Sequence, residues 1–156
     1  MGVDKTKKLL QKLEIAWSDF RESYAGLSES EVLKPGVTGQ WSVKDIVAHV
    51  TTWEEETLKH LPGILRGEKC PRYSLRYGGI DAFNALMTEN KKRFSFSQVL
   101  SQQDATHRKV IRFIEGVPKE FLDGKTRFRH HLRMDTYSHY PKHAAAIRWW
   151  RRTFQD

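Results

Sequence analysis

Four amphipathic segments set the strongest limit on what this chain can fold into. They span about residues 4–26, 43–60, 97–115 and 134–153, and each repeats apolar side chains at three- and four-residue spacing. In the first segment Leu9, Leu13, Trp17 and Phe20 share one stripe, as in a helix that packs on a core by one face. No useful length of sequence alternates with the two-residue period of a strand. The pattern therefore predicts an all-α protein built as a four-helix bundle.

Local signals mark where these helices begin and end. Ser42 followed by Asp45 resembles a capping box at the start of the second helix. The pair Pro62-Gly63 predicts the end of that helix, and Gly116 predicts the end of the third.

A long connection, residues 61–96, separates the second helix from the third. Within it, residues 81–92 are expected to form a short extra helix with Asp81 as its N-cap. Such a connection could cross the bundle and make neighbouring helices parallel. The expected fold is thus a four-helix bundle with a long crossover that contains a short extra helix.

Length and composition favour one globular domain over residues 1–156. A chain of 156 residues with 38% hydrophobic residues can bury a normal core. It has no apolar run long enough to cross a membrane, and its first residues lack the apolar centre of a signal peptide. Its one cysteine, Cys70, fits a reducing compartment and has no base beside it in the sequence. We therefore expect a cytoplasmic protein in which Cys70 is not a nucleophile.

The formal net charge of +8 raises the question of a nucleic-acid partner. The basic residues are scattered along the chain, however, and no recognisable DNA-binding motif accompanies them. Solvated helix faces explain the charge more simply, so specific nucleic-acid binding is not expected.

Three histidines carry the strongest chemical signal. His49 lies in the second helical segment, and His139 and His143 lie four residues apart in the fourth. Residues four apart on a helix share a face, and both histidines fall on the side that carries Tyr140. Neutral imidazoles from two helices suit a divalent transition metal, and three protein ligands leave one coordination position open. Hydrogen-bonded core histidines are the competing interpretation, and His107 in the third segment fits it.

Two long motifs then give a family resemblance. The stretches GQWSVKDIVAHVTTWEE and TYSHYPKHAAAIRWW, with Asn84 and the segment THRKVIRFIEG, resemble the DinB-like superfamily of four-helix bundles, and the DfsB branch most closely. The resemblance implies a metal site of one histidine in the second helix and an HxxxH pair in the fourth, here His49, His139 and His143. It also implies a divalent ion such as zinc, nickel or iron. Pro141 inside the pair departs from a regular helix and could displace the ligands.

The resemblance implies two kinds of activity. Superfamily members include metal-dependent transferases that use low-molecular-weight thiols such as bacillithiol or mycothiol. A self-protection group in the DfsB branch instead opens a strained cyclopropane in a genotoxin without that metal chemistry. Many relatives in this branch lack the second histidine of the pair, whereas this chain keeps it as His143.

The first functional hypothesis is a metal-dependent thiol transferase or hydrolase that acts on a small electrophilic molecule. Glu56 lies two turns beyond His49 and is a candidate general base, although a solvated glutamate is the simpler reading of the run of residues 54–56. Tyr140 is a second candidate catalytic residue and could equally be a core aromatic. The predicted substrate-binding side chains are Trp53, His107 and Tyr137.

The second hypothesis is a metal-independent pocket that binds or detoxifies a small electrophile. A nucleic-acid-associated protein is third and rests on charge alone. Bundles of this kind often dimerise, so a homodimer is a further expectation. Trp53 shares a helix face with Ile46 and Val50, so it is expected to be largely buried against the fourth helix.

Overall fold

A computed structural model describes residues 4–155, and the fold within this range is helical. No strand occurs among these residues, only an isolated bridge between Thr38 and Trp41. The predicted all-α fold is therefore confirmed. The elements in chain order are α1 (Lys5–Ser23), α2 (Glu29–Val32), α3 (Val43–Leu65), α4 (Tyr73–Arg76), α5 (Ile80–Lys91), α6 (Phe96–Glu115), the 3₁₀-helix η1 (Lys119–Leu122), α7 (Arg127–Asp135) and α8 (His139–Gln155).

Side-chain caps fix the starts of the long helices. The Ser42 hydroxyl accepts from the Asp45 amide at 3.1 Å, and Asp45 accepts from the Ser42 amide at 3.0 Å. This reciprocal pair satisfies two amides that lack a helical partner, and it confirms the predicted capping box. Ser95 and Gln98 form the same arrangement at the start of α6.

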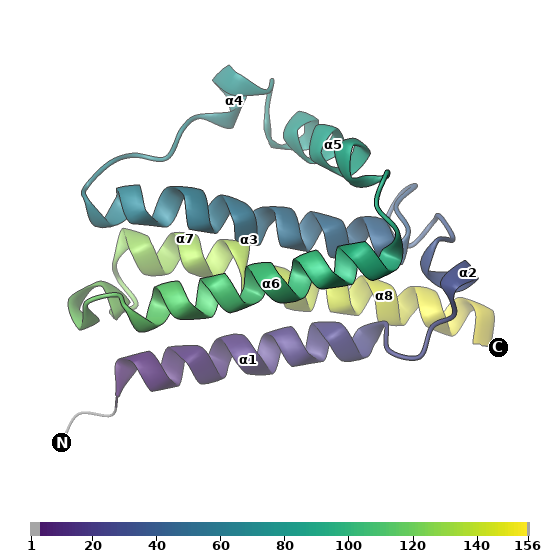
Figure 1. The fold of residues 1–156 in the computed structure, drawn as a ribbon, viewed down its shortest axis with the longest axis horizontal. Coiled ribbons are helices and arrows are strands. Elements are labelled where there is room, and N and C mark those ends of the chain that lie inside the picture. Colours follow the sequence, from purple (N-terminus) through teal and green to yellow (C-terminus); the bar gives the residue numbers. More distant parts are fainter. Residues whose placement is uncertain (1–3, 156) are drawn as a thin grey trace.

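The crossover decides the topology of the bundle (Figure 1). From the end of α3 the chain passes over the bundle through α4 and α5 and returns to the other end before α6 begins. As a result α3 and α6 run in the same direction, whereas α1 and the α7–α8 pair run the opposite way. The parallel neighbours that the long connection suggested are therefore present, as is a short helix inside the crossover.

The core is centred on α3, which is buried on most of its sides. It packs mainly against α6 and α7 and also contacts α5, α8 and α2. Removing apolar area from water at about 25 cal/mol per Å² is the main force that holds such a bundle together. The largest fully buried side chains include Phe20, Phe83, Phe128 and Tyr140.

The fourth predicted helix is two helices, which corrects the expected single segment at residues 134–153. α7 ends at Asp135, and α8 begins at His139. The Thr136 hydroxyl donates to the carbonyl of Leu132, and the Thr136 carbonyl accepts the amides of His139 and Tyr140 at 2.8 Å. Pro141 is therefore the third residue of α8, where a missing N–H breaks no helical bond. The kink that Pro141 suggested does not arise.

Two predicted helix boundaries in the crossover also differ from the structure. Pro62-Gly63 does not end α3, which continues to Leu65 before the Glu68 amide turns back to the Gly63 carbonyl at 2.9 Å. A proline one turn from a helix end removes only one bond, so the helix can continue past it. The N-cap of α5 is Gly79 at φ +121°, a left-handed backbone that favours glycine, and Asp81 lies in the first turn instead.

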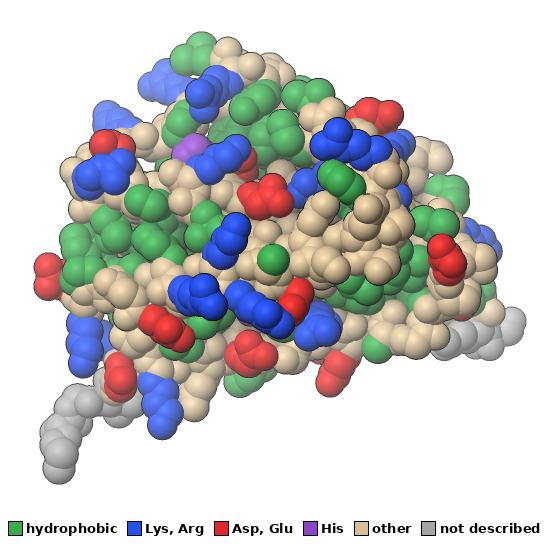
Figure 2. All heavy atoms as spheres, viewed as in Figure 1, with side chains coloured by type: hydrophobic (Ala, Val, Ile, Leu, Met, Phe, Trp, Pro, Cys, Tyr) green, Lys and Arg blue, Asp and Glu red, His purple; other side chains and the backbone are tan. Residues whose placement is uncertain are grey.

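Charges on the molecular surface alternate in sign. On the face shown in Figure 2, Lys and Arg side chains are interspersed with Asp and Glu side chains. Exposed pairs such as Arg108 with Asp104, at 2.7 Å, belong to this mixed surface. None of the helices formed by residues 4–155 combines the length and apolarity that a bilayer crossing requires.

Candidate metal centre

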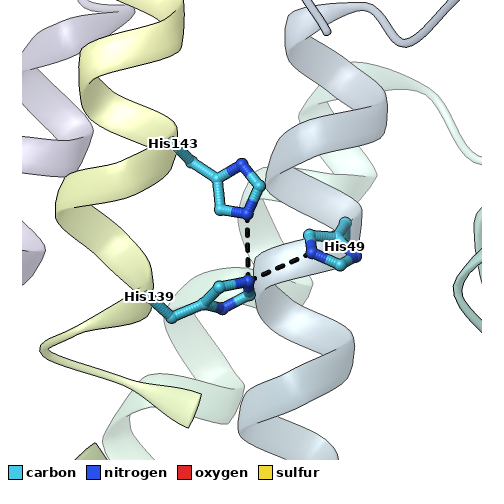
Figure 3. A group of neighbouring side chains, drawn as sticks. All are labelled: His49, His139 and His143. Carbon is cyan, nitrogen blue, oxygen red and sulfur yellow. Dashed lines mark hydrogen bonds between the residues drawn. The ribbon is translucent and has the colours of Figure 1, made fainter. Parts of the chain in front are cut away.

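Two helices of the bundle bring the three predicted histidines together. His49 lies in the second turn of α3, and His139 and His143 occupy the first and second turns of α8. The break after α7 matters here because it makes His139 the first residue of a new helix. Both α8 imidazoles then extend toward α3 from the same face (Figure 3).

The imidazoles face one another through the same ring nitrogen. His139 Nε2 lies 3.1 Å from His49 Nε2 and 2.9 Å from His143 Nε2 (Figure 3). One ligand atom from each residue falls within 4.8 Å of the other two. Within residues 4–155, this is the only group of three or more histidine, cysteine or acidic side chains that meets this spacing.

Burial keeps these imidazoles neutral. His49 and His143 are 6% and 8% exposed, and His139 is partly buried. Desolvation, together with the positive charges of Lys142 and the neighbouring imidazoles, lowers the pKa of His139 to about 2. The same burial lowers the pKa of His49 to about 3 and of His143 to about 4. At neutral pH all three rings therefore keep a lone pair for a ligand.

The donor set fits a divalent transition metal. Three neutral nitrogen donors from separate turns are the ligands that zinc, nickel and iron accept, and no carboxylate is paired with any of the three rings. The buried Nδ1 of His139 has no hydrogen-bond partner. Trp41 covers one side, with its ring centre 4.8 Å from that of His49. The arrangement can thus hold an ion in a site screened from bulk water.

The predicted site residues His107 and Tyr140 belong to a different cluster. His107 Nδ1 lies 3.1 Å from Oε2 of Glu54, which is fully buried, and the His107 ring stacks on Trp17 at 3.8 Å. Tyr140 is fully buried beside them, and burial followed by the charge of Glu54 raises its pKa well above the usual value. Burial likewise raises the pKa of Glu54. We call Glu54 and His107 the Glu54–His107 pair.

The predicted general base Glu56 forms a third polar cluster. Its carboxylate accepts from the Tyr73 hydroxyl at 2.8 Å and lies 2.9 Å from His60 Nε2 and 3.1 Å from Lys59 Nζ. Burial alone would raise the pKa of Glu56, but these donors outweigh it and hold the pKa below its usual value. Glu56 is therefore buried and bonded to its own partners rather than solvated, and none of these partners is a triad histidine.

Trp53 lies under the crossover, which corrects the expected burial against the fourth helix. It is half-buried, its indole N–H donates to Asn84 at 2.9 Å, and its ring packs on Tyr73 and Phe83. The wheel placed Trp53 on a buried face correctly, but the partner is α5 rather than α8. Tyr137 faces α1 and α7, where its hydroxyl accepts from Arg129 at 3.2 Å.

Cys70 gains a neighbour that its sequence surroundings do not show. Its Sγ lies 3.8 Å from Nδ1 of His131, which belongs to helix α7 and not to a basic loop as the sequence suggested. Burial and the charge of Asp135 raise the pKa of the Cys70 thiol, and burial lowers the pKa of His131. The thiol therefore stays protonated at neutral pH, consistent with the expectation that Cys70 is not a nucleophile.

Sequence reasoning missed Glu54 and Trp41. Glu54 was hidden in an acidic run that resembles a solvated face, and only the helical position opposite His49 could have pointed inward. Trp41 directly precedes the capping box, and an apolar residue at that position often packs back on its helix.

The comparisons with known proteins agree with this architecture. Residues 12–149 match the DinB superfamily. The structure of the colibactin self-resistance protein ClbS in complex with a double-stranded DNA is similar, with a TM-score of 0.77 and 16% identity over 94% of this chain and 95% of that chain. The sibling lethal factor precursor DfsB gives a TM-score of 0.80 and 12% identity over 97% and 98% of the two chains.

A further similar structure is an uncharacterised protein from Escherichia coli UTI89, with a TM-score of 0.79 and 13% identity over 95% of this chain and 93% of that chain. A search of the curated proteins found no significant match. Identities this low establish the fold that is shared with ClbS and DfsB. Because the family match covers most of the sequence, this chain belongs to the DinB superfamily.

Proposed function

We propose that His49, His139 and His143 hold a divalent transition-metal ion at the centre of a metal-dependent thiol transferase or hydrolase for a small electrophile. The observation that carries this proposal is the convergence of three neutral Nε2 atoms within 4.8 Å. Their mutual contacts satisfy no charge and involve no carboxylate. Zinc, nickel and iron are the ions whose ligand preference matches three imidazoles.

Three protein ligands leave a coordination position open, as in catalytic rather than structural sites. A divalent ion held there lowers the pKa of a bound water or thiol and so supplies a nucleophile at neutral pH. The positive charges of Lys91 and Lys142, which help to lower the pKa of His49, also favour a thiolate over a neutral thiol near the triad. Trp41 beside His49 offers an apolar wall for an electrophile.

The remaining predicted residues stay proposals. Glu56 can act as a general base only by exchanging one of its donors, of which Tyr73 is the closest. Tyr140 and His107 lie on the far side of His139 in the cluster of Glu54, so we propose that they support the site from behind it. Trp53 and Tyr137 are proposed to bind substrate parts that reach α5 or α1.

Elemental analysis of protein purified without a histidine tag is the direct test. We expect about one transition-metal ion per chain after exposure to zinc, nickel or iron(II). The loaded protein should speed the reaction of a thiol such as cysteine with 1-chloro-2,4-dinitrobenzene, and chelation should remove that activity. Stoichiometric metal without any thiol-transfer or hydrolytic activity would limit the site to metal binding.

A metal-independent binding or self-protection protein is the second candidate. It is favoured by the structural likeness to ClbS, which is described as a colibactin self-resistance protein. A His139→Ala variant separates the two functions, because it removes a metal ligand and keeps the rest of the bundle. Unchanged binding of an electrophilic small molecule by this variant would support the second candidate over the first.

Association with duplex DNA is the third candidate, supported by the net charge of +8 and by the DNA in the ClbS structure. Because the surface charges are mixed in sign, we propose weak, sequence-independent binding. Such binding should fall steeply with salt as counterion release loses its driving force. Sequence-specific binding that resists salt would contradict this expectation.

A further inference from the structure

A basic hollow lies between the first turns of α1 and the segment that joins η1 to α7. Its volume is about 450 Å³, and its floor is formed by the apolar side chains of Leu9 and Leu122. Around this floor lie Lys5, Lys8, Lys12, Arg129 and Asp123. None of these residues belongs to the histidine triad, so the inference below stands apart from the proposed metal chemistry.

The three lysines reach the hollow because of their spacing. Lys5, Lys8 and Lys12 differ by three and four positions on α1, which places them on one face of the helix. The buried residue Leu9 lies beside that face and anchors the helix to the core. Folding therefore gathers three ammonium groups that have no reason to approach one another in an extended chain.

Arg129 is fixed at the far wall by neutral partners. Its guanidinium donates to the Leu122 carbonyl at 2.6 Å and to the Tyr137 hydroxyl at 3.2 and 3.3 Å. These bonds use three of its five N–H groups, which leaves two for a ligand. A guanidinium held in this way is pre-organised to bind an oxyanion, because its orientation is set before the ligand arrives.

The hollow carries an excess of positive charge. Four cations face one carboxylate, and that carboxylate, Asp123, lies 3.7 Å from Lys5. Among residues 4–155, Lys8, Lys12 and Arg129 form no ion pair with an acidic side chain. Like charges gathered without counter-charge destabilise the fold, and an anion with several charges would relieve that repulsion.

We propose that this hollow is a binding site for the phosphate groups of a multiply charged anion. Its volume accepts a molecule the size of a di- or triphosphate, and the fixed guanidinium with three mobile ammonium groups is the donor set that phosphates prefer. The phosphates can belong to a small phosphorylated compound or to a nucleic-acid backbone, since both present the same oxyanions.

Tripolyphosphate is the probe, and the full chain is titrated with it by calorimetry at low salt. The test variant is Lys8→Ala/Lys12→Ala, which removes two exposed lysines that make no structural hydrogen bond. The matched control is Lys7→Ala/Lys109→Ala, which removes the same charge from exposed positions outside the hollow. We expect the test variant to weaken binding about tenfold or more and the control to weaken it less than about twofold.

A short DNA duplex forms the second arm of the experiment. If the duplex displaces tripolyphosphate, the phosphates of the natural ligand come from nucleic acid. If tripolyphosphate binds with the expected variant pattern and the duplex does not displace it, the ligand is a small phosphorylated compound. Either result upholds the site and identifies its source of phosphate.

Equal weakening by the two double variants would overturn the proposal, because the effect would then follow net charge and not the hollow. Failure of tripolyphosphate to bind the unmodified chain would overturn it as well. Circular dichroism of both double variants checks that the helical content is unchanged. The triad plays no part in this assay, so its outcome does not depend on whether the metal site is correct.

Discussion

The histidine triad and the Glu54–His107 pair are both buried imidazole clusters on α3, yet they are built for different ends. In the pair, His107 has a carboxylate partner at 3.1 Å and an aromatic ring stacked on one face. In the triad, His139 has only other imidazoles, at 2.9 and 3.1 Å. A histidine with a buried carboxylate is already satisfied, whereas three facing lone pairs are not.

The difference also reverses the direction of the pKa shifts. Burial lowers the pKa of every triad histidine, to about 3 for His49, and raises the pKa of the Glu54 carboxyl. The triad therefore gives up protons on folding, and Glu54 holds its proton more tightly. Burial depth alone does not separate a ligand from a core histidine, but the chemical nature of the nearest partner does.

The largest expected effect lies in the Glu54–His107 pair. Glu54→Ala leaves His107 buried without its partner, and we expect the free energy of unfolding to fall by about 3–5 kcal/mol. Urea denaturation at pH 7 measures this change. The double variant Glu54→Leu/His107→Leu should recover most of the loss, because it removes both polar groups together. A double variant as unstable as the single one would show that packing, and not the pair, holds this region.

The next effect concerns metal affinity. His139→Ala should weaken binding of zinc by more than about a hundredfold, or about 2.8 kcal/mol, since even outer partners of metal ligands contribute up to that range. His130→Ala is the matched control, because it removes an exposed imidazole from the neighbouring helix α7. Competition with a chromophoric chelator gives both affinities. Equal losses in the two variants would remove the distinction between the triad and an ordinary histidine.

The third effect is the dependence of stability on pH in chelator-treated protein. The folded pKa of His143, about 4, lies below the unfolded value near 6.5, so the unfolded state binds the proton first as pH falls. Each such histidine should lower the free energy of unfolding by about 1.4 kcal/mol per pH unit below pH 6.5. Its stabilising contribution is complete above that pH.

Denaturation curves at pH 7, 6 and 5 measure this slope. A His143→Gln variant should show a shallower slope because one titrating group is lost. Glu54 acts in the opposite direction, since its raised pKa makes the folded state bind protons more readily. An identical slope in the variant would mean that His143 is not buried in the neutral form.

The smallest effect is expected at Pro141. Because it is the third residue of α8, Pro141→Ala should restore no helical hydrogen bond and should change stability by less than about 1 kcal/mol. Zinc affinity should stay within about twofold of the unmodified chain. A large gain in affinity would indicate that the proline does strain the His139–His143 pair.

Much of the fold could be predicted from local sequence signals. The amphipathic periodicity located α1 and α6 within a few residues, and the Ser42–Asp45 pair located the start of α3. The break at Thr136 was missed because the residues on either side continue an apolar pattern, while the break depends on hydrogen bonds to Leu132 and His139. Wheel arguments give the face of a side chain but not the element that covers it, as Trp53 shows.

The candidate site was predictable to a similar extent. Four-residue spacing and inward placement were sufficient to bring His139 and His143 to one face, and the family pattern added His49. The Glu54–His107 pair was not predictable, since it joins residues far apart in the sequence and requires a charged side chain in the core. A long acidic run gives no local sign of which member is buried.

The crossover has a consequence for how this protein reaches its native state. The main neighbour of α3 is α6, and residues 66–95 must be carried over the bundle before these two helices can meet. Closing such a loop costs chain entropy before any contact repays it, unlike the short turn of an antiparallel helix pair. The rate-limiting step of folding should therefore be the docking of α6 on α3, so substitutions between these helices should slow folding, whereas those in α5 should mainly speed unfolding.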